Sequence, residues 1–264
     1  MKIVNFKGGL GNQISIYLFY LYLKRHCPHE RICGAYWSKS LREHTDFQLE
    51  KVFDVALPPR SLLTDFISKA ACWMEMRGLV STEEGPHSVF FNGVWLDKKY
   101  WDELPPASAL RFRPVSLSAK NEEYRRQIAA TESVSVHIRR GDYQQGRNKE
   151  CFGAFCTLDY YRAAIAEMSR SGEPLRFFVF SDDVDWVRNN LPIDNAVYVT
   201  GNEGNDSWLD LYLMSLCRHN IIANSTFSFW AAMLNANPSK RVFYPRRWYI
   251  WDNPDIFPAD WKAL

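Results

Sequence analysis

Apolar runs separated by polar and glycine-rich turns predict alternating strands and helices in the first half of the chain. Residues 3–6 form a short apolar run, which leads through a glycine-rich turn into a long apolar segment. This order of strand, glycine turn and helix is typical of an open α/β sheet. Apolar positions at helical spacing predict a helix over 61–79 that breaks at Gly78, and residues 89–95 are expected to form another strand.

The second half of the chain alternates more regularly. Residues 133–138 (SVSVHI) place β-branched side chains at alternate positions, which predicts a strand. Residues 158–169 have helical periodicity, and the apolar run 177–180 (FFVF) is typical of a buried strand in a parallel sheet. A helix is expected to open at Asp182. The alternation of strands and helices continues through residues 197–199, 210–217, 220–223, 226–234 and 241–244.

Two βαβ-type halves joined by a proline-containing linker indicate two domains. The linker covers residues 105–117, which carry prolines and no clear periodicity. A chain of 264 residues has room for two domains of about 130 residues each. We therefore expect an α/β protein with Rossmann-like domains over 1–118 and 119–264 and a ligand cleft between them, and a final helix that packs back on the first domain.

Composition narrows the function classes. The chain has 32 Lys and Arg against 30 Asp and Glu, so it lacks the basic excess of a nucleic-acid-binding protein. With 47% hydrophobic and 23% charged residues it is expected to be globular. Aromatic residues make up 15% of the chain, and their rings suit either the core or a platform for a sugar or base.

Cysteine spacing and hydropathy give expectations about location. The six cysteines form no C-x-x-C pair, which favours reduced thiols over a disulfide framework or a metal site. The first residues lack the pattern of a signal peptide. The longest apolar run, residues 14–23, is shorter than the roughly 20 residues of a membrane span. We expect a cytoplasmic protein whose contact with membranes is at most peripheral.

The turn at residues 8–13 (GGLGNQ) is the first candidate ligand site. Gly9 and Gly11 would allow backbone to approach a ligand closely, and the helix N-terminus that follows favours an anion. The dinucleotide fingerprint is incomplete because Ile14 stands where its third glycine would be, which argues against NAD. A tight turn without a ligand is the alternative.

Residues 137–143 (HIRRGDY) form the second candidate, at the carboxyl end of a predicted strand, where open α/β sheets bind ligands. The guanidinium forks of Arg139 and Arg140 suit a diphosphate. Asp142 could hold an arginine or accept a proton, and His137 is a second candidate base. The alternative is a surface loop with an internal Arg–Asp pair.

Two predicted helix starts also present polar groups. Residues 180–186 (FSDDVDW) contain Asp183 and Asp185, which could hold a metal, although carboxylates in a first helical turn are more simply explained by capping. Residues 224–230 (NSTFSFW) place hydroxyl groups at the next helix start, where they could cradle a phosphate or act as a cap.

These segments together resemble the α-1,2-fucosyltransferases of glycosyltransferase family 11. The resemblance rests on GGLGNQ near the N-terminus, HIRRGDY at mid-chain, FSDD followed by Trp186, and NSTFSFWAA. Residues 91–101 (FNGVWLDKKYW) are similar to a further family segment with substitutions. The match extends from Gly8 to Tyr244, and Phe229 stands where the family commonly has Trp.

The resemblance implies a GT-B architecture, with two Rossmann-like domains facing a cleft and the nucleotide held by the C-terminal domain. It implies GDP-β-L-fucose as donor and a terminal β-galactoside of a glycan as acceptor. The product would be an α-1,2 link formed with inversion, and neither a metal nor another cofactor would be required.

By motif position, the resemblance also implies roles for single residues. Arg139 would meet the diphosphate, Arg140 would brace its loop and Asp182 would lie near the guanosine. Asn12, in the turn with Gly9 and Gly11, would lie near the β-phosphate or the reacting sugar. The phosphate cradle would comprise Asn224, Ser225, Thr226, Phe227 and Ser228. Trp95 and Tyr100 could stack on the acceptor, although a core role is equally compatible with the sequence.

Two other function classes remain open. The chain could use GDP-fucose to make a different linkage, or it could be a noncatalytic protein that binds a nucleotide sugar or a carbohydrate. Turnover of GDP-fucose and the linkage of any product would separate the three.

Overall fold

The computed structural model describes residues 1–36, 46–79, 88–104, 110–153, 155–170, 172–251 and 253–264. These residues form two compact units, Met1–Pro114 and Val115–Leu264. The division lies four residues before the expected one at 118/119. It falls within a stretch without regular structure, which ends where the first helix of the second unit begins at Ala119. The expected linker falls partly outside the described residues, at 105–109.

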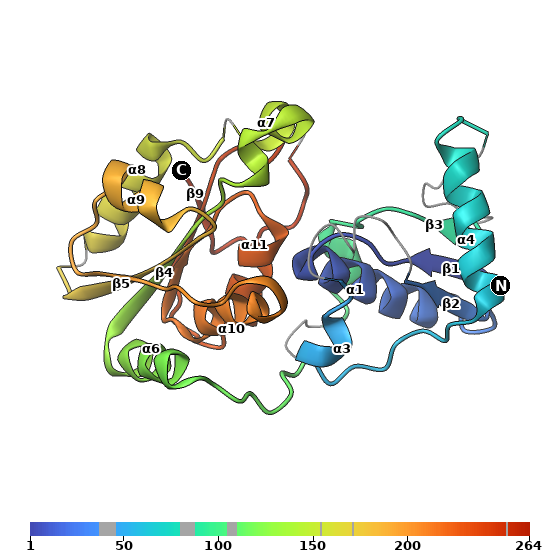
Figure 1. Ribbon diagram of the computed structural model, residues 1–264, viewed down its shortest axis with the longest axis horizontal. Coiled ribbons are helices and arrows are strands. Elements are labelled where there is room, and N and C mark those ends of the chain that lie inside the picture. The colour runs from blue at the N-terminus through green and yellow to red at the C-terminus, as the bar shows by residue number, and fades with distance from the viewer. Residues whose placement is uncertain (37–45, 80–87, 105–109, 154, 171, 252) are drawn as a thin grey trace. The chain divides into compact units, whose positions relative to one another are not determined.

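The N-terminal unit is built on a small parallel sheet of order β2-β1-β3 (Figure 1). Its strands are β1 (Lys2–Asn5), β2 (Ile32–Ala35) and β3 (Phe90–Phe91), and its helices are α1 (Leu10–His26), α3 (Leu49–Val52), α4 (Leu62–Glu75) and the short 3-10 helix η1 (Lys98–Tyr100). Strand β3 is shorter than the expected 89–95. The backbone turns away before Trp95, which has a positive φ of 59°.

Helix α1 fixes the glycine turn that precedes it. It is apolar around most of its circumference and is therefore buried along most of its length. Its buried Gln13 donates to the carbonyls of Gly8 and Asp46, each at 3.0 Å, and accepts from the backbone N–H of Gln48 at 2.9 Å. Gly8 has a φ of +73°, which only glycine adopts without strain, so the turn requires glycine at this position.

The C-terminal unit is a six-stranded parallel sheet of order β6-β5-β4-β7-β8-β9. The strands are β4 (Glu132–Ile138), β5 (Leu175–Ser181), β6 (Ala196–Tyr198), β7 (His219–Ile221), β8 (Val242–Tyr244) and β9 (Lys262–Ala263). The helices are α6 (Ala119–Ala130), α7 (Gly146–Phe152), α8 (Leu158–Ser169), α9 (Val184–Asn190), α10 (Trp208–Leu216) and α11 (Thr226–Leu234), with 3-10 turns η2 (Asp142–Gln144) and η3 (Gly204–Asp206). This strand order is that of a doubly wound Rossmann sheet, whose switch point lies between the carboxyl ends of β4 and β7.

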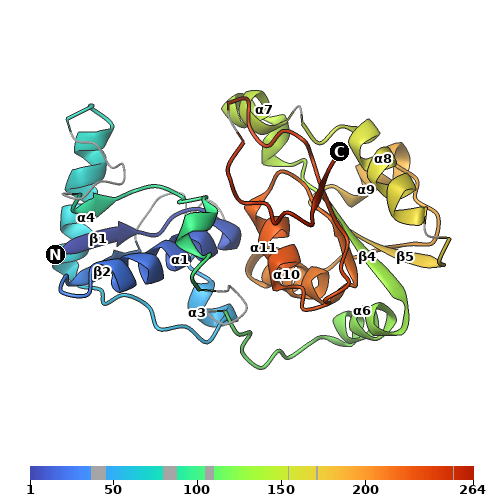
Figure 2. The same ribbon diagram turned by 180° about the vertical axis from the view of Figure 1, so that it is seen from behind.

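Helices cover both faces of this sheet (Figure 2), with α8 and α9 on one face and α6, α10 and α11 on the other. Val134, Val136 and Ile138 point to the first face and form an apolar core with α8 and α9. The opposite face holds buried polar side chains, where Asn220 donates to Ser135 at 2.7 Å and accepts from Asn235 at 2.8 Å. Because these polar groups have hydrogen-bond partners within the protein, their burial carries little cost in folding free energy.

Two expectations for the C-terminal half are wrong in detail. Asp183 rather than Asp182 caps α9, because its carboxylate accepts from the backbone N–H of Trp186 at 3.2 Å. The chain ends in strand β9, which pairs with β8, and not in a helix that packs on the first unit. Prolines at 254 and 258 interrupt this last segment, and its rings pack instead, with Phe257 stacked on Tyr244 at 3.8 Å.

Candidate functional site

Arg139 lies at the carboxyl end of the central strand β4 and is held by two carboxylates. Its guanidinium donates to Asp142 at 2.7 and 2.9 Å and contacts Asp182 at 3.1 Å. Asp142 follows within the same loop, whereas Asp182 follows the neighbouring parallel strand β5, which the sheet register brings alongside. The arginine side chain is 31% exposed, so these pairs fix a cation at the edge of the sheet without sealing it from solvent.

Arg140 is braced by the adjacent helix. Its backbone N–H donates to Asp182 at 2.8 Å, and its guanidinium contacts Asp183 at 3.3 Å. The guanidinium carbon lies 3.3 Å from the ring centre of Trp186. Stacking on an aromatic ring and pairing with a carboxylate hold the side chain in one place.

His137 is buried beneath these arginines. Burial, reinforced by the charge of Arg139 and opposed by that of Asp182, lowers the pKa of His137 to about 4. Its Nδ1 has no hydrogen-bond partner among the described residues, and its ring centre is 5.9 Å from that of Phe227. The imidazole is therefore neutral near pH 7 and leaves one buried polar atom available.

Asn224 joins four segments at the carboxyl end of β7. Its amide donates to the carbonyls of Phe152 at 3.0 Å and Trp248 at 3.1 Å, and its carbonyl oxygen pairs with the Cys156 thiol at 3.1 Å. Its backbone carbonyl accepts from the Tyr143 hydroxyl at 3.0 Å. All polar atoms of its side chain are thus engaged within the protein, so Asn224 shapes the site rather than offering a free group to a ligand.

The hydroxyl groups at the start of α11 are used mainly for capping. Ser225 is the N-cap, and its side chain accepts from the backbone N–H of Phe227 at 3.4 Å. Ser228 is buried and lies 3.4 and 3.5 Å from the carbonyls of Ser225 and Ala223. Thr226 and Phe227 are only partly buried. The helix start remains suited to an anion because its backbone N–H groups carry a partial positive charge.

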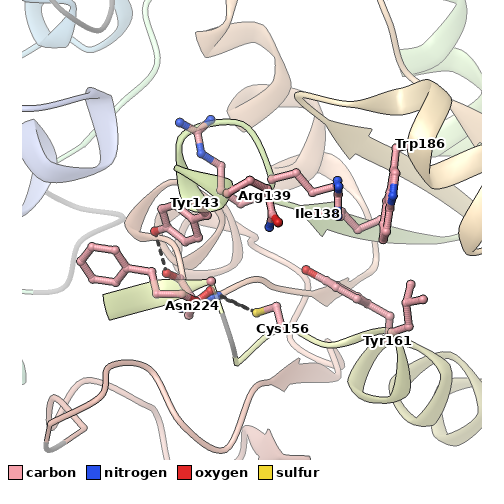
Figure 3. Close-up of a pocket in the computed structure, with 12 residues that line it drawn as sticks. Ile138, Arg139, Tyr143, Cys156, Tyr161, Trp186 and Asn224 are labelled. Atoms are coloured by element: carbon pink, nitrogen blue, oxygen red, sulfur yellow. Dashed lines mark hydrogen bonds between the residues drawn. The ribbon is translucent and has the colours of Figure 1, made fainter. Parts of the chain in front are cut away.

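A small pocket of about 30 Å³ opens between these elements (Figure 3). Ile138, Arg139 and Arg140 line it together with Tyr143, Gln144, Phe152, Gly153, Cys156, Leu158, Tyr161, Trp186 and Asn224. Figure 3 shows Asn224 bonded both to Tyr143 and to Cys156 beneath the arginine loop. A pocket of this size holds about one water, so a nucleotide would have to open it or lie across its mouth.

Several pocket residues escaped the sequence analysis. Tyr143 closes the HIRRGDY motif, yet nothing in the sequence showed that its hydroxyl bonds to Asn224, which follows the neighbouring strand β7. No sequence pattern pointed to Cys156, because its hydrogen-bond partner Asn224 lies 68 residues away in the chain. Burial raises the pKa of the Cys156 thiol to about 12, which suits a structural thiol and not a nucleophile. All six cysteines are free thiols.

The remaining predicted residues lie in the N-terminal unit. Gly9 is the N-cap of α1, and Gly11 and Asn12 lie in its first turn after β1. Tyr100 is buried and Trp95 is partly buried. Phe19 contacts both rings, with centroid distances of 4.1 Å to Trp95 and 5.0 Å to Tyr100. The structure therefore gives Trp95 and Tyr100 a place in an aromatic cluster, and contact with an acceptor stays a prediction.

The described residues hold neither a cluster of metal ligands nor a helix that could cross a membrane. No group of three or more His, Cys, Asp and Glu side chains in that part of the chain is arranged to hold a metal ion. The paired acids of residues 183 and 185 belong to a capped helix start, as the capping interpretation predicts. None of the described helices combines the length and hydropathy needed to cross a bilayer.

Comparison with known proteins identifies relatives. The sequence profile of Glycosyl transferase family 11 matches residues 116–252. An α-1,2-colitosyltransferase of Escherichia coli is 35% identical over 67% of this chain and 63% of its own length. The O-antigen biosynthesis glycosyltransferase WbnK of Escherichia coli is 34% identical over 65% of this chain and 57% of its own length. A galactoside α-(1,2)-fucosyltransferase 1 of Ateles belzebuth is 34% identical over 38% of this chain and 28% of its own length.

A solved structure supports the fold. A mutant of FUT1 of Arabidopsis thaliana in complex with GDP has a TM-score of 0.50 and 12% identity, and the match covers 93% of this chain and 70% of that chain. The two parallel α/β sheets are those of a glycosyltransferase of the GT-B type. The chain belongs to glycosyltransferase family 11, and it spans less than two thirds of the length of the two Escherichia coli relatives.

Proposed function

We propose that this glycosyltransferase moves L-fucose from GDP-β-L-fucose to the 2-hydroxyl of a terminal β-galactoside, forming an α-1,2 link with inversion. The observation that carries the proposal is Arg139, a fixed guanidinium at the switch point of the sheet and next to the start of α11. A guanidinium fork and a helix N-terminus both favour a diphosphate. The residues from 119 to 264 would bind the donor, and those from 1 to 118 would bind the acceptor.

Inversion requires one displacement at the anomeric carbon. The acceptor hydroxyl attacks from the side opposite GDP, the bond from the anomeric carbon to the β-phosphate oxygen breaks, and negative charge grows on that oxygen. Arg139 would stabilise this charge in the transition state, and the N–H groups at the start of α11 would add to the effect. Arg140 would hold the loop in place through Asp183 and Trp186.

The two candidate bases differ in their surroundings. The first candidate, Asp142, is paired with Arg139, as Asp182 is, which supports a role in orienting the guanidinium. The lowered pKa of His137 makes its imidazole a weak base, although its free Nδ1 could accept a hydrogen bond from a ligand. On the acceptor side, Asn12 with Gly9 and Gly11 would approach the donor phosphate or the reacting sugar.

A second donor merits the same test. The α-1,2-colitosyltransferase of Escherichia coli is similar over 67% of this chain, so a colitosyl donor is the alternative to a fucosyl donor. The proposed linkage is the same for both.

The test is a donor–acceptor screen with the purified full chain. GDP release is measured with GDP-fucose or GDP-colitose, each with and without lactose, and with and without a chelator. The proposal predicts release from GDP-fucose that rises with the β-galactoside and is insensitive to the chelator. Saturable GDP binding without turnover would indicate a noncatalytic binding protein. Faster GDP release from GDP-colitose than from GDP-fucose would show that the donor sugar is colitose.

A further inference from the structure

Helix α4 of the N-terminal unit has its apolar face outward. The fully buried residues on its inner face are small or polar, namely Thr64, Asp65, Ser68 and Ala71, and the partly buried Ile67 and Cys72 pack beside them against the core of the unit. Thr64 donates to the carbonyl of Gly34 at 3.3 Å, and Ser68 donates to Asn5 at 3.4 Å, so polar contacts attach this face to the sheet. A surface helix normally places its apolar stripe against the core. In α4 only small or partly buried apolar side chains lie against the core, while Leu62, Phe66 and Trp73 are exposed.

The outer face and the turn that follows carry six exposed apolar side chains. They are Leu62 (89% exposed), Leu63 (62%), Phe66 (69%), Trp73 (49%), Met76 (78%) and Leu79 (64%), which together we call the docking face. Steps of three, four and seven residues keep most of these side chains on one side of the helix. Both ribbon views show the C-terminal half of α4 extending beyond the strands of its unit. Large exposed apolar patches mark interaction sites.

Two cationic side chains of the described residues border the docking face. Lys69 and Arg77 are exposed at its centre and end, and Arg77 lies 3.7 Å from the ring centre of Trp73. Both carboxylates of α4 turn toward the protein, because Asp65 pairs with Arg60 at 3.0 Å and Glu75 accepts from Asn92. Among the residues of α4 and its C-terminal turn, up to Leu79, the side chains presented outward are therefore mainly apolar, with Lys69 and Arg77 among them.

We infer that the docking face binds the surface of an anionic lipid bilayer, with α4 lying in the plane of the interface. Leucine, phenylalanine and methionine side chains would enter the acyl boundary. Trp73 would lie at headgroup level, and Lys69 and Arg77 would extend to lipid phosphates. A second copy of the chain fits less well, because a symmetric contact through this face would bring the same cations together.

Vesicle co-sedimentation of the full chain tests this inference. We expect the protein to bind vesicles that contain phosphatidylglycerol, and to bind vesicles of phosphatidylcholine alone more weakly. The triple variant Leu62→Ser, Phe66→Ser, Met76→Ser should lose binding by at least about tenfold, because three apolar side chains no longer leave water. The pair Lys69→Gln, Arg77→Gln should lose the preference for phosphatidylglycerol.

The controls separate docking from misfolding and from self-association. The pair Leu216→Ser, Ile250→Ser removes apolar side chains that are 40% and 50% exposed elsewhere and should bind vesicles like wild type. Thermal unfolding of each variant reports folding. The inference is overturned if wild type stays free of anionic vesicles, or if the triple variant is folded and binds them equally. It is also overturned if the docking face instead holds a dimer that the triple variant dissociates.

Discussion

Arg139 is preorganised by charges that a ligand would have to replace. Its guanidinium is shared between Asp142 and Asp182, so the cation is paired at the edge of the sheet. A diphosphate that enters would exchange one anionic partner for another. The side chain would then keep its geometry at little reorganisation cost, which is what stabilisation of a developing charge requires.

Replacing Arg139 by alanine should therefore act mainly on the transition state. We expect kcat/KM for the donor to fall about 100- to 1000-fold, or roughly 3–4 kcal/mol, as for the loss of one oxyanion donor. The matched control is Arg162→Ala, which breaks a 3.1 Å pair with Asp159 on the exposed face of α8. Initial rates of GDP release measure both, and an Arg139→Ala enzyme as active as the control would contradict the assignment.

His137 makes folding sensitive to acid. Because burial and Arg139 lower its pKa to about 4 from the ordinary 6.5, the unfolded chain takes up a proton between these values and the folded chain does not. Stability should thus be complete above about pH 6.5 and fall as the pH drops toward 4, by about 2 kcal/mol from this group at about pH 4.5.

The variant His137→Gln isolates that contribution. The free energy of unfolding of wild type and variant is measured with urea at about pH 7 and at about pH 4.5. On acidification it should fall less in the variant, since the other titrating groups are common to both proteins. Equal losses would mean that His137 is protonated in the folded protein or titrates normally.

At the scale of elements, the junction of β7 and α11 depends on one side chain. Asn224→Ala should lower the free energy of unfolding by roughly 2–4 kcal/mol, because it removes partners from two backbone carbonyls and a buried thiol. The control Asn190→Ala removes a single exposed contact with the carbonyl of Trp186 and should cost less than about 1 kcal/mol. Denaturant unfolding compares the two, and similar losses would refute the central role of Asn224.

The elements themselves were largely predictable, because periodicity records local burial. Strands β4 and β5 and helices α8 and α11 lie close to the ranges that the apolar pattern predicts. Contacts across the sheet were not predictable. Asp182 was expected near the guanosine, and the structure adds that it bonds to Arg139 and Arg140, which lie 43 and 42 residues earlier in the chain. A final helix that packs on the first unit was expected, whereas the chain ends in strand β9 after two prolines, at 254 and 258.

Helix α4 shows what apolar periodicity does not predict, namely which face of a helix is buried. Its apolar spacing correctly predicts a helix, yet the spacing alone implies that the apolar side chains face the core. Only the structure shows that the largest apolar side chains, Leu62, Phe66 and Trp73, are exposed. A pattern gives the period of a helix and not the environment on each side of it.

At the scale of the whole molecule, each unit has its own parallel sheet and its own core. We therefore expect the fragment Val115–Leu264 to unfold cooperatively when expressed alone. Because the proposed diphosphate contacts belong to this unit, the fragment should bind GDP within about tenfold of the full chain while transferring no sugar. Calorimetric titration measures the affinity, and a folded fragment that ignores GDP would refute the proposed division of labour.

The most direct test of the central claim is the linkage of the product. The full chain is incubated with GDP-β-L-fucose and lactose, and the product is analysed by NMR for the anomeric configuration and the substituted hydroxyl. The proposed function predicts an α-configured fucose on the 2-hydroxyl of galactose, and far less product from Arg139→Ala than from Arg162→Ala. A β-configured product, a different substituted hydroxyl, or GDP binding without any product would contradict it.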